Sequence, residues 1–250
     1  MIRIRNLWKR FGNNQVLTGL DLDVRKGETL VILGRSGVGK SVLLRHIIGL
    51  EKPDQGTVEL DGVIISELKR PELFLAVKNM GMLFQGSALF DSMTVEENTS
   101  FYLNQHHKHL PEEEVRDQVK SALKKVGLEG TEKKMPSDLS GGMRKRAGLA
   151  RLLVYRPSIL LYDEPTTGLD PITAKQISEL IMQTQKELNG TSIVVTHDIA
   201  SALMIADRLA LHQDGKIAHV GEPLKFMQID HPIINFLRDS YKREFRIDTE

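Results

Sequence analysis

The chain has 250 residues with 34 Lys and Arg against 33 Asp and Glu, and its formal net charge of +1 excludes a global basic field that would draw it onto nucleic acid or an anionic membrane. It has no cysteine, which excludes disulfides, thiol nucleophiles, and cysteine-ligated zinc or iron–sulfur sites. No apolar run approaches the ~18–20 residues that span a bilayer, and the first residues lack the apolar stretch of a signal peptide. We therefore expect a cytoplasmic protein that has no nucleic-acid partner and reaches a membrane only through another protein.

The first part of the chain predicts strands, followed by an alternation of strands and helices. Residues 1–24 predict strands, because apolar side chains recur there at roughly every second position. The run from Leu30 to Leu33 is continuously apolar, as expected of a strand that is buried on both faces. Similar runs with helical patterns between them predict a parallel α/β sheet. The further runs are residues 80–84, 159–162 and 193–196, and the helical patterns are residues 41–49, 172–188 and 199–206.

The middle of the chain lacks strand patterns. Across residues 85–155 the apolar spacing is mostly helical, and it includes a helix that begins after Pro111 with an acidic first turn. We expect this segment to be a helical insertion in the sheet domain. The pairs Asp61-Gly62 and Asp214-Gly215 each predict a hairpin, and the tail of residues 222–250 predicts helix again.

A glycine-rich motif follows the first buried strand. Residues 34–41 match the pattern G-x-x-x-x-G-K-[ST], with an apolar strand before the motif and an apolar helix after it. Glycines let the backbone wrap around a phosphate group, and the amides at the start of a helix attract an anion. Lys40 would bring a positive charge to the terminal phosphates, and Ser41 would offer a hydroxyl to Mg²⁺. The residues predicted to hold the phosphates of a nucleotide here are Gly34, Arg35, Ser36, Gly37, Val38, Gly39, Lys40, Ser41 and Val42.

Two carboxylates end another apolar strand. Asp163 and Glu164 directly follow the run of residues 159–162, and the carboxyl ends of parallel strands line the ligand crevice of an open α/β sheet. Asp163 would bind Mg²⁺, partly through water, because Mg²⁺ keeps several of its waters. Glu164 could polarise an attacking water. An acidic cap at a strand end is the alternative for this pair taken alone, and the upstream phosphate loop favours the magnesium site.

Further motifs resemble those of ABC-transporter ATPase subunits, in the right order and across residues 1–220. Leu139-Ser140-Gly141-Gly142-Met143 resembles the signature sequence of that family. Gln85 matches its Q-loop, Thr167 to Asp170 resemble its D-loop, and His197 matches its switch histidine. Phe11 stands where the family places the aromatic residue that stacks on adenine, although a core position is a second interpretation of this side chain.

The resemblance implies a fold and a set of roles. The fold is α/β: a P-loop NTPase core with a parallel sheet, an N-terminal antiparallel β subdomain and an inserted α-helical subdomain at about residues 86–155. Residues 1–221 would form the ATP-binding domain, and residues 222–250 a helical tail that we expect to brace a dimer. The implied catalytic residues are Lys40, Gln85, Glu164 and His197, and the implied Mg²⁺ ligands are Ser41, Gln85 and Asp163.

The resemblance also implies a head-to-tail homodimer with two ATP molecules at its interface. The signature residues Ser140, Gly141, Gly142 and Met143 would contact the nucleotide that is bound to the other subunit. Free amides and a positive helix end at this position suit an anion. Asp170 would lie near the dimer interface and couple the two sites.

Met143 refines the resemblance, because the usual family signature ends in Gln. The signature with Met and the basic residues after it resembles the Mla/Mce-type phospholipid-transport ATPases. This implies a separate integral membrane permease, an MCE-domain lipid-binding protein and a small STAS-domain partner. The chain would then be peripheral on the cytoplasmic face of the inner membrane. An ABC ATPase for another solute, or a soluble ABC-type ATPase, are the alternatives.

Three other segments carry expectations of their own. A permease coupling helix would dock beside the Q-loop, or the same residues would form the core of the helical subdomain. The basic run Arg144-Lys145-Arg146 predicts a solvated helix face, and His106-His107-Lys108-His109 predicts a polar loop. The expected docking residues are Gly86, Ser87, Leu89, Phe90, Asp91, Met93 and Thr94.

Overall fold

The computed structural model describes residues 1–245 and divides the chain into two compact units. The first unit comprises residues 1–78 together with the chain from residue 192 onward, and the second comprises residues 79–191. Each of them is described by itself below. Within residues 1–245, no helix combines the length and the apolar character that crossing a bilayer requires.

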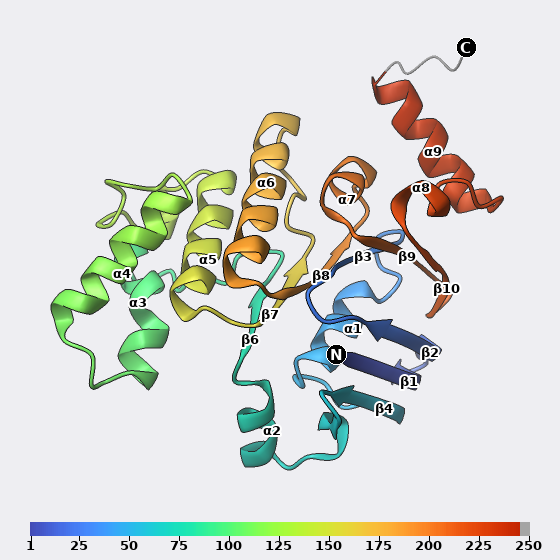
Figure 1. Ribbon diagram of the computed structural model, residues 1–250, viewed down its shortest axis with the longest axis horizontal. Coiled ribbons are helices and arrows are strands. Elements are labelled where there is room, and N and C mark those ends of the chain that lie inside the picture. The colour runs from blue at the N-terminus through green and yellow to red at the C-terminus, as the bar shows by residue number, and fades with distance from the viewer. Residues whose placement is uncertain (246–250) are drawn as a thin grey trace. The chain divides into compact units, whose positions relative to one another are not determined.

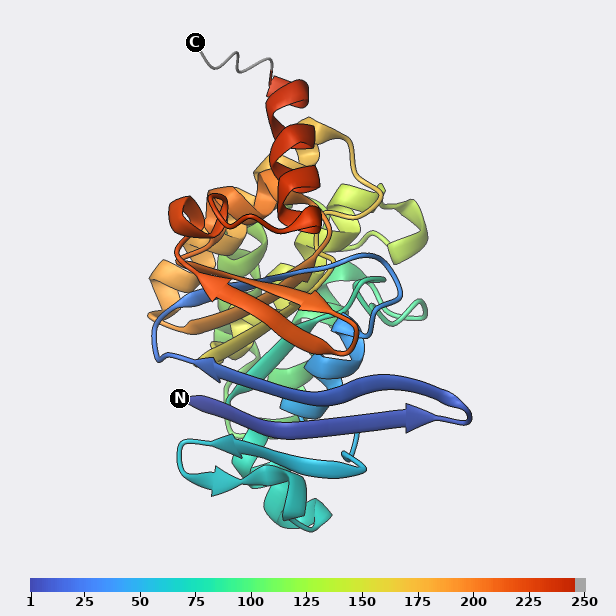
Figure 2. The same cartoon turned by 90° about the vertical axis from the view of Figure 1, so that its right-hand side faces the viewer.

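An antiparallel sheet forms the amino-terminal part of the first unit (Figure 2). Its strand order is β2-β1-β4-β5, which agrees with the strands expected over residues 1–24. Along β1, the side chains of Ile2, Ile4 and Leu7 are buried, because alternate residues of a strand point to the same face. The strands are β1 (Ile2–Phe11), β2 (Asn14–Val24), β4 (Gln55–Leu60) and β5 (Val63–Ile64).

A second group of strands in the first unit is mainly parallel. In the order β10-β9-β3-β8, the central strand β3 pairs in parallel with both β8 and β9, and β10 is antiparallel to β9. All five residues of β3 are buried, as expected of a central parallel strand. The strands are β3 (Thr29–Leu33), β8 (Thr191–Thr196), β9 (Arg208–Gln213) and β10 (Lys216–Gly221).

Both predicted hairpins are present in the first unit. Asp61-Gly62 joins β4 to β5, and Asp214-Gly215 joins β9 to β10. The second turn also contacts β2, where the Thr18 hydroxyl donates to the Asp214 carbonyl at 2.7 Å and the Thr18 amide donates to the Gly215 carbonyl at 3.0 Å. The helices and short helical turns of this unit before its tail are α1 (Lys40–Ile47), η1 (Ile65–Glu67), α2 (Arg70–Val77) and α7 (Ile199–Ile205).

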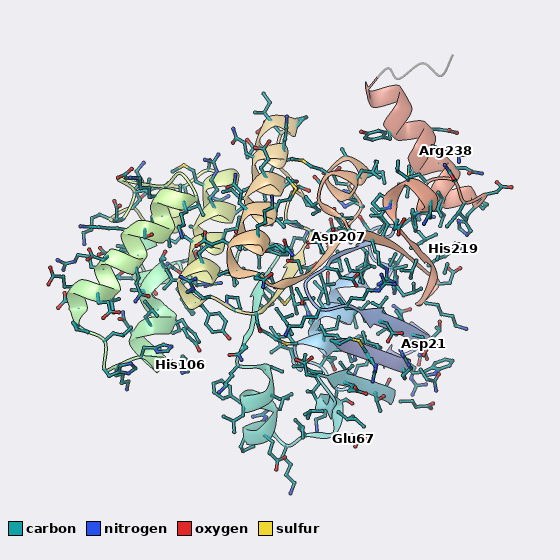
Figure 3. All side chains as sticks on the ribbon, viewed as in Figure 1. Asp21, Glu67, His106, Asp207, His219 and Arg238 are labelled. Atoms are coloured by element: carbon teal, nitrogen blue, oxygen red, sulfur yellow. The ribbon has the colours of Figure 1, made fainter. Side chains whose placement is uncertain are left out.

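Two helices lie in the tail of the first unit up to residue 245, and residues 246–250 of the predicted helical tail lie outside the described residues. The side chains of Phe226 and Ile234 are fully buried, so the tail packs onto its own unit. Arg238, labelled on α9 in Figure 3, donates from its guanidinium to the Met227 carbonyl at 3.0 Å and thereby links α9 to the end of α8. The helices are α8 (Pro223–Phe226) and α9 (Pro232–Phe245).

The second unit holds two parallel strands and a group of helices. β6 (Met80–Leu83) and β7 (Ile159–Asp163) pair in parallel. Figure 1 shows α3, α4 and α5 packed together, and the described part of residues 86–155 contains no strand, as the helical spacing predicted. The helices are α3 (Val95–His106), α4 (Glu112–Lys125), η2 (Pro136–Asp138), α5 (Gly141–Tyr155) and α6 (Pro171–Leu188).

Candidate functional site

The glycine-rich loop connects β3 to α1 and has the backbone geometry of a phosphate cradle. A Cβ atom on Gly34 would lie 2.8 Å from the His212 carbonyl, and one on Gly39 would lie 2.5 Å from the side chain of Val16. Gly39, the N-cap of α1, also has a φ of 102°, which side chains rarely adopt, and its position provides no side-chain cap for the helix. The amino-terminal end of α1 is therefore not capped by a side chain at Gly39, and such a helix end attracts an anion.

Lys40 is positioned inside this loop. Its side chain is only 4% exposed, and its ammonium donates to the carbonyls of Gly34 at 2.7 Å and Arg35 at 3.0 Å. The backbone of the loop thus surrounds the Lys40 ammonium, which would bind the phosphates. Ser41 follows in the first turn of α1, where a hydroxyl is a suitable oxygen ligand for Mg²⁺. The residues present fit a bound nucleoside triphosphate with Mg²⁺.

His212 on β9 lies beside the same loop and was not singled out from the sequence. It is 1% exposed, and neither ring nitrogen has a hydrogen-bond partner among residues 1–245. Burial, with a smaller contribution from the positive charge of Lys40, lowers the pKa of His212 to about 4, so the imidazole is neutral in the folded protein at physiological pH. His212 follows the apolar residues Leu209 to Leu211 in β9, and nothing in this pattern indicates that its ring lies beside the glycine-rich loop.

Two further predicted residues of the first unit are accessible. Phe11 ends β1 and is 44% exposed, which contradicts the interpretation that it is a core residue and leaves its ring available for stacking. The ammonium of Lys9 lies 5.3 Å from that ring and is held by Glu51 at 2.7 Å. His197 directly follows β8 and is exposed, while the next residue, Asp198, caps α7.

In the second unit, Asp163 and Glu164 stand at the carboxyl end of β7 and are 5% and 7% exposed. Glu164 has a φ of 47°, a left-handed conformation that is uncommon for a residue other than glycine. The Thr167 hydroxyl donates to the Glu164 carboxylate at 3.0 Å, and the Thr167 amide donates to the Glu164 carbonyl at 3.3 Å. Thr167 therefore fixes this glutamate, a contact that its place in the D-loop motif did not predict.

Lys145 contradicts the expectation that the basic run forms a solvated face. Arg144 is exposed, but Lys145 is only 5% exposed and points into the second unit. Its ammonium donates to the Gln85 carbonyl, and to the Glu164 carbonyl at 3.3 Å. Burial lowers the pKa of Lys145, and the negative charges of Asp163 and Glu164 oppose that shift. The helix places every third or fourth residue on its buried face, and Lys145 falls on that face.

The signature residues form the start of α5. Ser140 is the N-cap, and its hydroxyl accepts from the Met143 amide at 3.3 Å. A Cβ atom on Gly142 would lie 2.5 Å from the side chain of Thr173 at the start of α6. Asp170 caps α6 and accepts from the Thr173 amide at 3.0 Å and from its hydroxyl at 2.6 Å. The signature and the D-loop are thereby packed together within one unit.

The segment after Gln85 differs in part from the expected docking surface. Gln85 and Gly86 are exposed, and Phe90 is 41% exposed, but Ser87 is buried because it packs against α5. Asn98 on α3 is fully buried and fixes the backbone of residues 90–94. Its side-chain amide donates to the carbonyls of Phe90, Met93 and Thr94 at 3.1, 2.9 and 3.0 Å. Leu89, Met93 and Thr94 are half-buried, and Asp91 is exposed.

The histidine-rich segment is not entirely the loop that was expected. His106, labelled in Figure 3, is the last residue of α3, and its ring stacks on Tyr102 with 4.6 Å between the centroids. His107 and His109 contact each other with ring centroids 5.8 Å apart. In the part of the chain that the structure describes, no three His, Asp or Glu side chains form a group that could hold a metal ion.

Comparisons with known proteins agree with this geometry. Residues 17–167 match the family described as "ABC transporter". The intermembrane phospholipid transport system ATP-binding protein MlaF of Haemophilus influenzae is 41% identical over 239 residues, which are 95% of this chain and 90% of that protein. The probable ribonucleotide transport ATP-binding protein mkl of Mycobacterium leprae is 41% identical over 93% of this chain, and this chain spans 67% of that protein.

A solved structure supports the fold as well. The ATP-binding cassette MJ0796, in a dimeric post-hydrolysis state bound to ADP and Pi, is 32% identical with a TM-score of 0.82, over 89% of this chain and 99% of that one. The P-loop NTPase fold expected from the sequence is therefore confirmed. The chain belongs to the ABC transporter family, and it is an ATPase subunit that binds ATP with Mg²⁺ and hydrolyses the nucleotide.

Proposed function

We propose that this subunit powers the movement of phospholipids across a cell envelope. The observation that carries the proposal is the 41% identity to MlaF, which extends over 95% of this chain and 90% of that protein. Met143 in the signature, where the family usually has Gln, supports the same assignment. ATP-binding residues 1–221, with a helical subdomain at about residues 86–155, would form the motor, and residues 222–250 its tail.

We assign the chemistry as follows. Lys40 and the amides of the glycine-rich loop hold the phosphates, and exposed Phe11 stacks on the adenine. Ser41, Gln85 and Asp163 hold Mg²⁺, which neutralises phosphate charge when bound. Glu164 accepts a proton from the attacking water, and His197 orients that water and the terminal phosphate. The Thr167 hydroxyl, 3.0 Å from the Glu164 carboxylate, holds the carboxylate in place until water arrives.

The partners follow from the same proposal. Two copies assemble head to tail, so that Ser140, Gly141, Gly142 and Met143 of one subunit meet the nucleotide of the other, and Asp170 lies at that interface. Partly exposed Phe90 with its neighbours from Gly86 to Thr94 receives an integral membrane permease on the cytoplasmic face of the inner membrane. An MCE-domain lipid-binding protein and a small STAS-domain protein complete the complex.

A second candidate function has an observation of its own. The mycobacterial relative of equal identity, 41%, carries the name of a ribonucleotide transport protein. The ATPase would then be the same motor with another cargo, because the cargo is chosen by the membrane partners and not by the nucleotide site. Both transport proposals require the chain to be found in membrane fractions with a partner, and a soluble ABC-type ATPase does not.

The deciding experiment is to purify the chain from detergent-solubilised native membranes and to identify the proteins and lipids that accompany it. We expect a permease, an MCE-domain protein and enriched phospholipid. The Phe90→Asp variant, which charges the proposed docking segment, should lose these partners, and Phe74→Asp on α2, at a side chain that is 57% exposed, should keep them. A different permease without enriched lipid would favour transport of another solute. Recovery of the chain without any membrane partner would overturn both transport proposals.

A further inference from the structure

Lys145 is a buried cation whose hydrogen bonds go to main-chain atoms of two motifs. From α5 its ammonium reaches the carbonyl of Gln85, beyond the end of β6, and the carbonyl of Glu164, beyond the end of β7. Its side chain is 5% exposed, so the charge has been taken out of water, which costs free energy unless several acceptors surround it. An ammonium has three donors, and a point charge of this kind can bind two carbonyls at once.

The main chain at these two places has a conformation that needs support. Glu164 is left-handed with a φ of 47°, and it precedes Pro165, which disfavours helical conformations in the residue before it. Beyond Gln85, Ser87 and Ala88 also have positive φ values, of 65° and 46°. Residues in such regions persist only where their surroundings hold them there.

α5 provides that support along its buried face. One turn after Lys145, Gly148 lets Leu83 and Ser87 approach, because a Cβ atom there would lie 2.6 Å from Leu83 Cδ1 and 3.5 Å from the Ser87 carbonyl. One turn later, the Arg151 guanidinium donates to the carbonyls of Ala88 at 2.9 Å and Ser87 at 3.2 Å. Of these two side chains, only Lys145 also holds Glu164.

We propose that Lys145 is a positioning residue for ATP hydrolysis, which fixes the main chain of Glu164 and Gln85 in a single frame at the buried face of the signature helix. The proposal rests on the role assigned to Glu164 above. Because α5 begins at Ser140, the helix that would engage the partner's nucleotide is the helix that holds this subunit's own Glu164. Engagement of the signature would therefore be transmitted to the general base through one side chain.

The test compares variants of the full chain in ATP hydrolysis. Lys145→Met keeps the length of the side chain but removes its charge and donors, and we expect kcat to fall about a hundredfold with KM for ATP nearly unchanged, because a shift of about 1 Å in a reacting group costs that much. Lys145→Arg, which restores charge and donors, should recover most of the rate. Arg151→Met, the matched control on the same face of α5, should keep kcat within about threefold, since it leaves Glu164 held.

A second variant and a second measurement test the proposal even if Lys145→Met folds poorly. Lys145→Gln retains a donor and tests the same step. Amide hydrogen exchange should accelerate in this variant at residues 164, 166 and 167 and at residues 85–88, but not in α1. In a Glu164→Gln background, the small residual rate of single-turnover hydrolysis should be insensitive to Lys145→Met. An equal loss in both backgrounds, or a kcat of Lys145→Met and Lys145→Gln near wild type while Glu164→Gln is inactive, would overturn the proposal. Normal turnover in Glu164→Gln would instead overturn the role of Glu164.

Discussion

At the scale of single residues, the chain buries several basic side chains near its motifs, and three of them show how different their surroundings are. Lys40 and Lys145 each donate to two main-chain carbonyls, which offsets the cost of burying their charge. His212 has no such partner among the described residues, and it stays neutral instead. Burial of a base is therefore tolerated here either by acceptors or by loss of the proton.

His212 makes the stability of the chain depend on pH in a defined window. The pKa of His212 is lowered from 6.5 to about 4 in the folded protein, so below about pH 6.5 the unfolded chain binds a proton that the folded chain does not. Unfolding is favoured progressively from pH 6.5 down to pH 4, and above pH 6.5 this effect disappears. Lys40, which adds to the shift, and Asp214, which opposes it, are the charged groups that act on the ring.

We expect His212→Leu to resist acid better than the native chain. The difference in free energy of unfolding should grow as the pH falls from 6.5 to 4 and reach on the order of 2–3 kcal/mol. Urea unfolding at several pH values measures it. His219 on β10, labelled in Figure 3, is half-buried, and His219→Leu provides a second histidine variant for comparison in the same urea series. Parallel pH curves for His212→Leu and the native chain would contradict the prediction.

At the scale of elements, the two tail helices are held to their unit by a few buried apolar side chains. α8 has only four residues, yet it carries Phe226, which is fully buried, and Leu224, which is 83% exposed. α9 contributes fully buried Ile234 and the hydrogen bond from Arg238 to Met227. The expectation that the tail braces a dimer stays a prediction. The buried side chains of the tail contribute to the packing of the first unit itself.

Phe226→Ala should destabilise the chain by about 3–5 kcal/mol, because it removes a buried aromatic ring and leaves a cavity. Leu224→Ala, in the same helix and exposed to solvent, should change stability by less than about 0.5 kcal/mol. Thermal and denaturant unfolding of both variants measures the difference. Similar small effects for the two would show that the ring of Phe226 can be lost without consequence.

Sequence patterns predicted the elements better than the surroundings of individual side chains. The hairpins at Asp61-Gly62 and Asp214-Gly215 and the buried run at Leu30 to Leu33 follow from local rules of turn geometry and apolar spacing. Lys145 lies within a basic run that predicts a solvated face, and only the packing of α5 against distant segments buries it. His212 gives no signal in the sequence for the same reason, because its neighbours come from other parts of the chain.

At the scale of the whole molecule, the predicted motifs are shared between two compact units. The glycine-rich loop, Phe11 and His197 belong to the first, and Gln85, Asp163, Glu164, the signature and the D-loop belong to the second. The proposed reaction needs both sets, and the proposed dimer adds the signature of another copy. ATP is then expected to favour the closed dimer, because the closed dimer would bind ATP more tightly than the open state does.

We expect Glu164→Gln to bind ATP, to lose turnover and to accumulate as a nucleotide-bound dimer, because the amide cannot accept the proton of the attacking water. Size-exclusion chromatography with light scattering, in the presence of ATP and Mg²⁺, measures the dimer. Lys40→Ala is the matched control: it should stay monomeric under the same conditions, since it lacks the charge that holds the phosphates. A monomeric Glu164→Gln with bound ATP would exclude the dimer as the closed state.

The attachment of the Q-loop segment to α5 has a consequence for how such a subunit could change partners. Lys145 and Arg151 bind carbonyl oxygens of Gln85, Ser87 and Ala88, and every amino acid offers a carbonyl. The exposed side chain of Ala88 can then change over generations, among residues that accept its positive φ, while the backbone stays fixed. A lineage could fit this segment to a new membrane protein by ordinary substitution, without redesigning the motor beneath it.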